Sequence, residues 1–122
     1  MAQVDIAALL ERYTACVTKG DVEGIVSLYA DEATLQIPVD GPLYEGIDAI
    51  RAFYAENELA ESLELTGSVR AAGLEAAAPM LAKVRRDGVL LAVDVIDVVR
   101  VDESGRVLSM RAYFDLEGAK PV

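Results

Sequence analysis

The chain contains no histidine and no tryptophan, and it has one cysteine among its 122 residues. Without histidine, neither a Ser-His-Asp nor a Cys-His nucleophile can form. Cys16 is alone, so there is no disulfide framework and no set of side chains typical of a zinc site. We therefore expect no metal and no cofactor, and any acid–base chemistry must fall to Asp, Glu, Tyr or Lys.

Basic residues are scarce, with 11 Lys and Arg against 21 Asp and Glu and a net charge of −10. This balance argues against nucleic acid or an anionic membrane surface as a partner. No apolar run reaches the length of a membrane span and no leader pattern is present, so a cytoplasmic protein is expected. The 53% hydrophobic and 26% charged residues are typical of a globular protein, and the length predicts a single domain over residues 1–122.

The stretch 91–101 is long, rich in β-branched residues and bounded by turn residues, which predicts a strand. On one of its faces Asp97 is the only polar residue in a row of six: Leu91, Val93, Val95, Asp97, Val99 and Val101. A carboxylate in an apolar row loses hydration without gaining a cation, so the pKa of Asp97 should rise and favour the neutral, hydrogen-bond-donating acid. The alternative is a bulge or a shift of register that turns Asp97 outward.

The first half of the chain contains three amphipathic segments with helical spacing. They predict helices over residues 4–18, roughly 22–30 and about 47–58. Gly20 is typical of a helix end, and Asp21 of the N-cap that begins the next helix. Each predicted helix places a tyrosine on its apolar side, namely Tyr13, Tyr29 and Tyr54. For Tyr13 or Tyr29 alone, ordinary core packing is the competing interpretation.

From Leu63 onward the hydrophobic period changes to two, which is typical of strands. After a short strand at 33–37, the alternating runs lie at about 63–69, 76–85, 91–101 and 106–115. Asp87-Gly88 predicts a β-hairpin, and residues 116–122 are expected to form a loose tail. Helices first and an antiparallel meander afterwards predict an α+β fold, in which a curved antiparallel sheet wraps around three N-terminal helices and encloses an apolar pocket.

Several stretches of the chain occur together, and in the same order, in a known family. They are Glu11-Arg12-Tyr13, Gly20-Asp21, Leu28-Tyr29-Ala30-Asp31-Glu32-Ala33-Thr34, Ile50-Arg51-Ala52-Phe53-Tyr54, Val95-Ile96-Asp97 and Gly105-Arg106-Val107-Leu108-Ser109-Met110-Arg111-Ala112. On these stretches the chain resembles the Δ5-3-ketosteroid isomerases, within the larger group of cone-shaped nuclear-transport-factor-like domains. The resemblance extends over nearly the whole chain. It implies a cone-shaped fold, a steroid-like hydrophobic ligand and a homodimer.

The resemblance also implies roles for individual residues. Tyr13 and Asp97 match the two groups that donate hydrogen bonds to the 3-oxygen of the substrate, which together form an oxyanion hole. Tyr54 and Tyr29 match tyrosines that extend this network from behind. Four further side chains are expected to contact the ligand: Ile37, Val95, Val99 and Phe114.

One position departs from the family pattern. The general base of the family is an aspartate at the end of the first short strand, just before a proline, and here Ile37 precedes Pro38. Isoleucine cannot carry the proton from C4 to C6 of a steroid, and loss of a base removes a factor of about 10² to 10⁴ or more. An intact oxyanion hole can still contribute several kcal/mol. We therefore expect Δ5-to-Δ4 isomerisation to be weak or altered.

Three interpretations of the missing base stay open. In the first, Asp40 in the adjacent loop serves as the base, although the sequence favours a solvated turn residue at this position. In the second, Tyr13 and Asp97 act as acids on a carbonyl, epoxide or enone of a polyketide or terpenoid, opening an epoxide or closing a ring. In the third, the chain is a non-catalytic protein that binds steroid-like ligands, and Ile37 adds apolar surface to the pocket.

Overall fold

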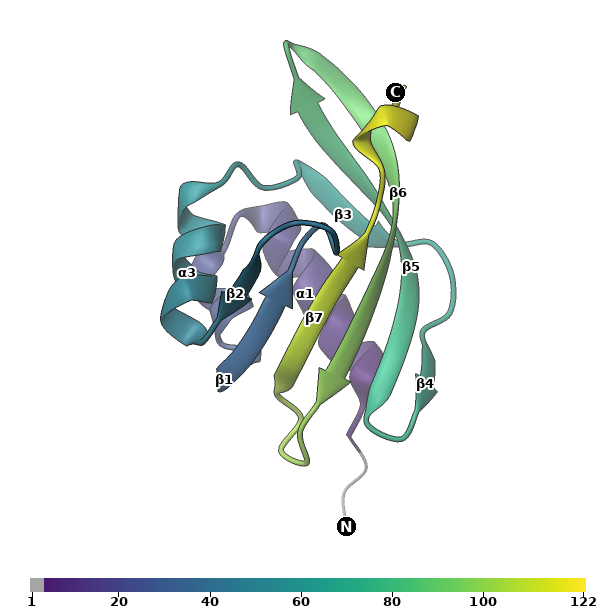
Figure 1. Cartoon of the computed structure of the whole chain (residues 1–122). Coiled ribbons are helices and arrows are strands. Elements are labelled where there is room, and N and C mark those ends of the chain that lie inside the picture. The colour runs from purple at the N-terminus through teal and green to yellow at the C-terminus, as the bar shows by residue number, and fades with distance from the viewer. Residues whose placement is uncertain (1–3) are drawn as a thin grey trace.

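The computed structural model describes residues 4–122 and contains three α-helices and a strongly curved sheet (Figure 1). The helices are α1 (Ile6–Lys19), α2 (Val22–Val26) and α3 (Ile47–Glu56), with a short 3-10 turn at Leu116–Gly118. The strands are β1 (Tyr29–Gln36), β2 (Leu43–Glu45), β3 (Ser62–Leu65), β4 (Arg70–Ala72), β5 (Glu75–Arg86), β6 (Val89–Val101), β7 (Val107–Tyr113) and β8 (Lys120–Pro121).

The sheet has the strand order β2-β1-β7-β6-β5-β3, with β4 paired to β5 and β8 paired to β6. The predicted α+β fold with a curved sheet and three helices is confirmed. The expectation of a wholly antiparallel sheet is wrong at one place, because β1 pairs with β7 in parallel, for example Leu35 with Met110. Parallel neighbours need a long crossover connection, and here most of the chain lies between the two strands.

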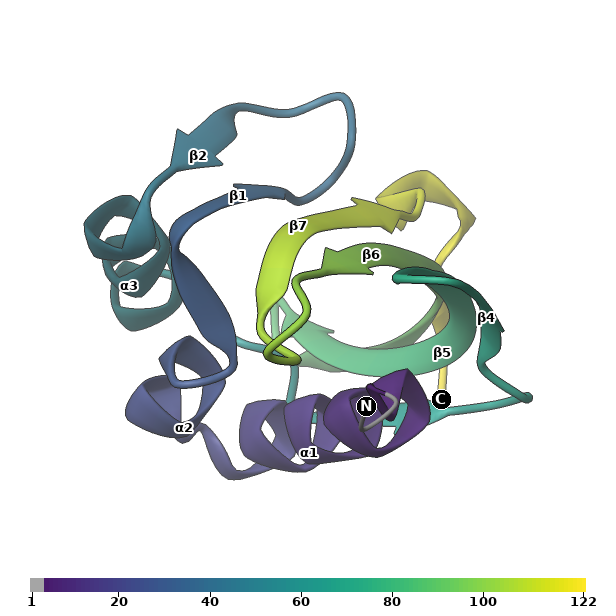
Figure 2. The ribbon, with the colours of Figure 1, turned by 90° about the horizontal axis from the view of Figure 1, so that it is seen from below.

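Helix α1 is capped at both ends, and Gly20 ends it as the sequence predicts. The Asp5 carboxylate accepts a hydrogen bond from the Ala8 amide at 3.0 Å, and Gly20 closes the helix in a left-handed conformation with φ of 69°. Its buried stripe includes Leu10, Tyr13 and Val17. Figures 1 and 2 show α1 lying across the inner side of the curved sheet, with α2 and α3 beside β1. The sheet and α1 therefore form two walls that face each other.

The second helix is shorter than the sequence predicts. Asp21 caps it as expected, accepting from the Gly24 amide at 2.9 Å, but the helix ends at Val26 rather than near residue 30. Tyr29 is the first residue of β1 instead, and it pairs with Val107 in β7. The apolar spacing requires only that the side chain of Tyr29 be buried, and Tyr29 is buried in β1 as it would be in a helix. Tertiary pairing decides between them.

Two segments that the sequence presents as loop or loose tail carry strands. In the turn-rich stretch after Pro38, β2 pairs with β1. At the C-terminal end, β8 pairs with the beginning of β6 through Leu91 and Ala92, and the Val122 amide donates to the Leu90 carbonyl at 3.0 Å. The expectation of a loose tail is therefore wrong. A two-residue strand carries too little alternation to be recognised in a sequence.

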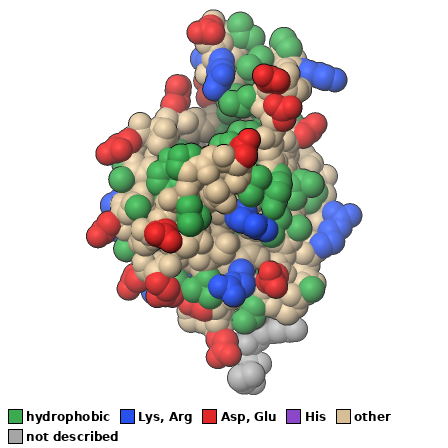
Figure 3. Space-filling view, in the orientation of Figure 1, with side chains coloured by type: hydrophobic (Ala, Val, Ile, Leu, Met, Phe, Trp, Pro, Cys, Tyr) green, Lys and Arg blue, Asp and Glu red, His purple; other side chains and the backbone are tan. Residues whose placement is uncertain are grey.

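The outer face of the sheet is exposed and partly apolar. Ile96 in β6 and Tyr113 in β7 are register partners with exposed fractions of 48% and 38%. The guanidinium carbon of Arg111 lies 5.8 Å from the centre of the Tyr113 ring. Figure 3 shows hydrophobic side chains gathered around Arg and Lys side chains on this face. Among residues 4–122, no helix is both long and apolar enough to cross a membrane.

Candidate functional site

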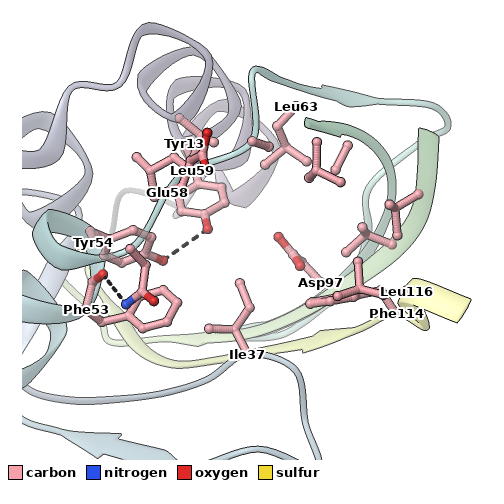
Figure 4. A pocket seen from close by; sticks show the side chains of 17 residues that line it. Tyr13, Ile37, Phe53, Tyr54, Glu58, Leu59, Leu63, Asp97, Phe114 and Leu116 are labelled. Atoms are coloured by element: carbon pink, nitrogen blue, oxygen red, sulfur yellow. Dashed lines mark hydrogen bonds between the residues drawn. The ribbon is translucent and has the colours of Figure 1, made fainter. Parts of the chain in front are cut away.

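A cavity of about 340 Å³ lies between α1, the end of α3 and the inner face of β5 and β6 (Figure 4). Its volume falls within the range of small-molecule sites. Most of the lining side chains are hydrophobic, and the polar ones belong to Tyr13, Tyr54, Asn57, Glu58 and Asp97. The lining residues are Tyr13, Val17, Ile37, Phe53, Tyr54, Asn57, Glu58, Leu59, Ala60, Leu63, Ala82, Val84, Val93, Val95, Asp97, Phe114 and Leu116.

Asp97 lies on the inner face of β6, as the alternation predicts, and only 3% of its surface is exposed. Its partners in the sheet register are Ala78 in β5 and Ala112 in β7, both almost fully buried. The methyl side chains of these two alanines offer the carboxyl group of Asp97 no hydrogen-bond partner. The carboxyl group points into the cavity, towards the side on which Tyr13 lies (Figure 4).

Burial raises the pKa of Asp97 from its ordinary value of 3.8 to about 7. The physical cause is loss of hydration, which penalises the carboxylate and leaves the neutral acid unaffected. At neutral pH the group is therefore divided between a hydrogen-bond donor and a negatively charged acceptor. A carboxyl group poised near the working pH is typical of functional sites, because both of its states are accessible.

The three tyrosines predicted to point inward form one hydrogen-bonded chain. The hydroxyls of Tyr29 and Tyr54 are 2.8 Å apart, and those of Tyr54 and Tyr13 are 3.0 Å apart. Burial raises the pKa of each phenol well above 10, so all three hydroxyls keep their protons at neutral pH. If Tyr29 donates to Tyr54, and Tyr54 to Tyr13, the Tyr13 proton is left to point into the cavity.

The other predicted site residues fall into two groups. Ile37, Val95 and Phe114 line the cavity, whereas Tyr29 lies behind it and reaches it only through Tyr54. Val99 does not line the cavity. Its register partners Ala76 and Met110 are buried with it, so it belongs to the hydrophobic core beyond Asp97.

Asp40 is not brought to the cavity either. Its side chain is exposed in the turn between β1 and β2, and it is absent from the cavity lining. The turn runs along the outside of the molecule, where a carboxylate stays hydrated. The structure therefore places Asp40 as a surface turn residue, and Ile37, which directly follows β1, lines the cavity.

Sequence reasoning missed one wall of the cavity, the segment Asn57-Glu58-Leu59-Ala60 that follows α3. It missed Leu116 as well, because the tail that carries it was expected to be loose. The helical spacing predicts that the third helix continues to about residue 58, whereas α3 ends at Glu56, and the tail has no periodicity, so nothing local indicates that either segment lines the cavity. In the described part of the chain, no three His, Cys, Asp or Glu residues gather closely enough to hold a metal ion.

Comparisons with known proteins agree with this architecture. Residues 10–110 match the SnoaL-like domain family. The chain is 35% identical, over 111 residues, to a steroid Δ-isomerase of Nocardioides simplex, and the match covers 90% of this chain and 89% of the relative. Its fold is similar to that of SalBIII, an epoxide hydrolase/cyclase-like enzyme with a role in pyran ring formation in the polyether salinomycin. The TM-score is 0.84 and the identity 24%, and the match covers 94% of both chains. The likeness to SalBIII concerns the fold alone.

Proposed function

The chain belongs to the SnoaL-like domain family, and from that premise we propose that its cavity binds a steroid or a similar apolar ketone or enone. The observation that carries the proposal is that a buried phenol and a buried carboxyl group, Tyr13 and Asp97, face the same apolar cavity. Similarity to a steroid Δ-isomerase over 90% of the chain supports this choice of ligand. The apolar wall would hold the hydrocarbon skeleton.

In this proposal the ligand oxygen accepts two hydrogen bonds, from the Tyr13 hydroxyl and from the protonated form of Asp97. Both donors are positioned before the ligand arrives, and both lie where water is excluded, so each is stronger than it would be in water. Tyr54 and Tyr29 would orient the Tyr13 proton through the chain of hydroxyls. Because donation by Asp97 needs its proton, binding of a ketone should weaken as the pH rises through about 7.

Isomerisation of a Δ5-3-ketosteroid also needs a base that removes a proton from C4 and returns it at C6. Ile37 stands where the resemblance places that base, and Asp40 lies outside the cavity. The donors alone would stabilise the enolate, whereas the proton transfer has no dedicated group. We therefore expect weak turnover of such substrates.

The experiment is a parallel assay of wild type, Ile37→Asp and Asp40→Asn with 5-androstene-3,17-dione. We expect Ile37→Asp to raise the isomerisation rate by about 10²-fold or more, because it places a carboxylate on the cavity wall. Asp40→Asn, which changes a charge in the neighbouring turn, should leave the rate unchanged. No gain from Ile37→Asp would contradict the proposed position of the substrate. A large loss from Asp40→Asn would instead restore Asp40 as the base.

Acid chemistry on another substrate is the second candidate function. A carboxyl group with a pKa of about 7 can protonate the oxygen of an epoxide or carbonyl, and Tyr13 can donate beside it. Attack of water at the carbon of the protonated epoxide would open it, and attack of a hydroxyl of the same polyketide or terpenoid would close a ring; in both cases the nucleophile's proton would return to the Asp97 carboxylate. It is distinguished by assaying an apolar epoxide beside the ketosteroid, and its rate should fall above about pH 7. Turnover of neither substrate, with binding retained, would favour a ligand-binding protein.

A further inference from the structure

The carboxyl group of Asp97 is buried without a partner of opposite charge. Among residues 4–122, no Lys or Arg lines the cavity that it faces, and burial is the only influence on its pKa. The group points into the cavity, and no hydrogen bond joins it to another of the described lining residues (Figure 4). When Asp97 is ionised, the protein therefore leaves a negative charge in an apolar cavity with nothing to offset it.

The titratable groups around Asp97 carry no positive charge either. Tyr13 faces it from α1 and Tyr54 from α3, with Tyr29 of β1 behind them, and these phenols keep their protons at neutral pH. Its neighbours in β5 and β7 are both alanines. In the described part of the chain, the one further ionisable side chain of the lining is an acid, Glu58. A positive charge that enters the cavity therefore meets no like charge on its wall.

Aromatic side chains make the same cavity suitable for a cation with a hydrocarbon body. Tyr13, Phe53, Tyr54 and Phe114 all belong to the lining. The faces of aromatic rings carry partial negative charge, which attracts cations, and their carbon surface packs against hydrocarbon. The Tyr13 oxygen is a further acceptor, because a hydroxyl has two lone pairs and its hydrogen bond with Tyr54 uses at most one of them.

We propose that the cavity also binds hydrophobic amines, whose ammonium group forms an ion pair with the ionised carboxylate of Asp97. This ligand class differs from the ketones of the proposed function, since a ketone needs the protonated carboxyl group and an ammonium needs the carboxylate. The protons balance: the amine arrives protonated, and where Asp97 is still neutral its proton leaves to solvent as the amine binds. The inference holds whether or not the natural ligand is a steroid.

The test uses two ligands with one cage skeleton, 2-aminoadamantane and 2-adamantanone. An alkylamine titrates near pH ~10, like that of lysine, so the amine stays protonated between pH 5.5 and 8.5. Calorimetry should show its affinity rising about 30-fold over this range, as the ionised fraction of Asp97 rises, while the affinity of the ketone falls by a similar factor. At pH 7 each bound amine should release about half a proton and each bound ketone should take up about half, which titrations in buffers of different ionisation enthalpy measure.

Asp97→Asn removes the carboxylate and keeps the size of the side chain. It should weaken amine binding at pH 8.5 at least about tenfold and abolish the pH dependence for both ligands. Asp94→Asn is the matched control, because it removes the same charge from the exposed face of β6. It should behave as wild type, which separates the ion pair from the general attraction of a cation to a protein with a net charge of −10.

An amine affinity that does not change with pH in wild type, or that survives in Asp97→Asn, would overturn this inference. Proton release is measured on wild type, so the inference stays testable even where the variant does not fold. Ketone binding without amine binding would overturn this inference alone. Amine binding without ketone binding would support it and overturn the donor pair of the proposed function.

Discussion

At the scale of single residues, the chemistry of the site depends on the small apolar side chains beside Asp97. Its sheet neighbours Ala78 and Ala112 supply no hydrogen bond, and burial alone raises its pKa to about 7. A polar side chain at either alanine could donate a hydrogen bond and stabilise the carboxylate. The small neighbours therefore matter as much as the aspartate, and they explain how an acidic group stays partly protonated at neutral pH.

The raised pKa makes the stability of the protein depend on pH. In the unfolded chain Asp97 loses its proton near pH 3.8, whereas in the folded protein it keeps the proton until about pH 7. Between these values the folded state binds more protons, so the free energy of unfolding falls as the pH rises and levels off above pH 7. The total loss is on the order of 4 kcal/mol, at about 1.4 kcal/mol for each pKa unit.

We expect Asp97→Asn to remove this loss, because asparagine is nearly the same size and never ionises. Urea unfolding at pH 5 and pH 8.5 should show wild type losing stability with pH and the variant losing markedly less. Asp94→Asn is the matched control, since Asp94 lies on the exposed face of the same strand, and it should follow wild type. Parallel pH profiles for Asp97→Asn and wild type would show that Asp97 is hydrated in the folded protein.

At the scale of elements, the β5–β6 hairpin builds one wall of the cavity, with Val84 on one strand and Val93 on the other. Its turn consists of Asp87 and Gly88, with φ of 51° and 79°. Two left-handed residues in succession match the twist of the flanking strands, which is why Asp-Gly is so strong a hairpin signal in a sequence. The sequence predicts this hairpin because its signal lies in two adjacent turn residues.

Gly88→Ala should lower the free energy of unfolding by about 1 kcal/mol, because an alanine is strained at positive φ. No atom lies within 4 Å of the added methyl group, so the cost comes from the backbone alone. Gly118→Ala is the control. Its methyl group also meets open space, but its φ is not positive, and it should be neutral or slightly stabilising. Equal urea midpoints for the two variants would contradict the explanation by backbone strain.

At the scale of the whole molecule, the curved sheet leaves one face without cover. Ile96 and Tyr113 lie side by side there, with Arg111 stacked near the Tyr113 ring. The resemblance to ketosteroid isomerases implies a homodimer, and we expect this outer face to be the contact surface. Two copies that each carry a net charge of −10 repel, so salt should tighten the pair by screening.

Sedimentation velocity tests this expectation. Wild type should dimerise, more tightly at 0.5 M than at 0.05 M NaCl, and Ile96→Asp should weaken the dimer at least about tenfold by placing a charge in an apolar contact. Val89→Asp is the control, because Val89 is equally exposed but lies beside the hairpin turn. A wild-type protein that stays monomeric at all concentrations would refute this use of the outer face.

The functional residues differ in how far the sequence determines them. Asp97 and Tyr13 were predictable because period-two and period-3.6 patterns assign each side chain to a face, and burying that face is what folds the chain. Val99 shows the limit of this reasoning. Alternation assigns it to the inner face with Asp97, but only the packing against Ala76 and Met110 places it in the core rather than on the cavity wall.

By itself, the sequence determined what depends on neighbours along the chain: the helix caps, the hairpin turn, the inner row of β6 and the apolar sides that bury the three tyrosines. Tertiary structure alone decided what depends on segments far apart. It paired β1 with β7, ended α2 at Val26, docked β8 on β6 and brought Asn57-Glu58 to the wall of the cavity. The physical reason is that local preferences are small and similar in size, so burial and strand pairing across the whole chain choose among them.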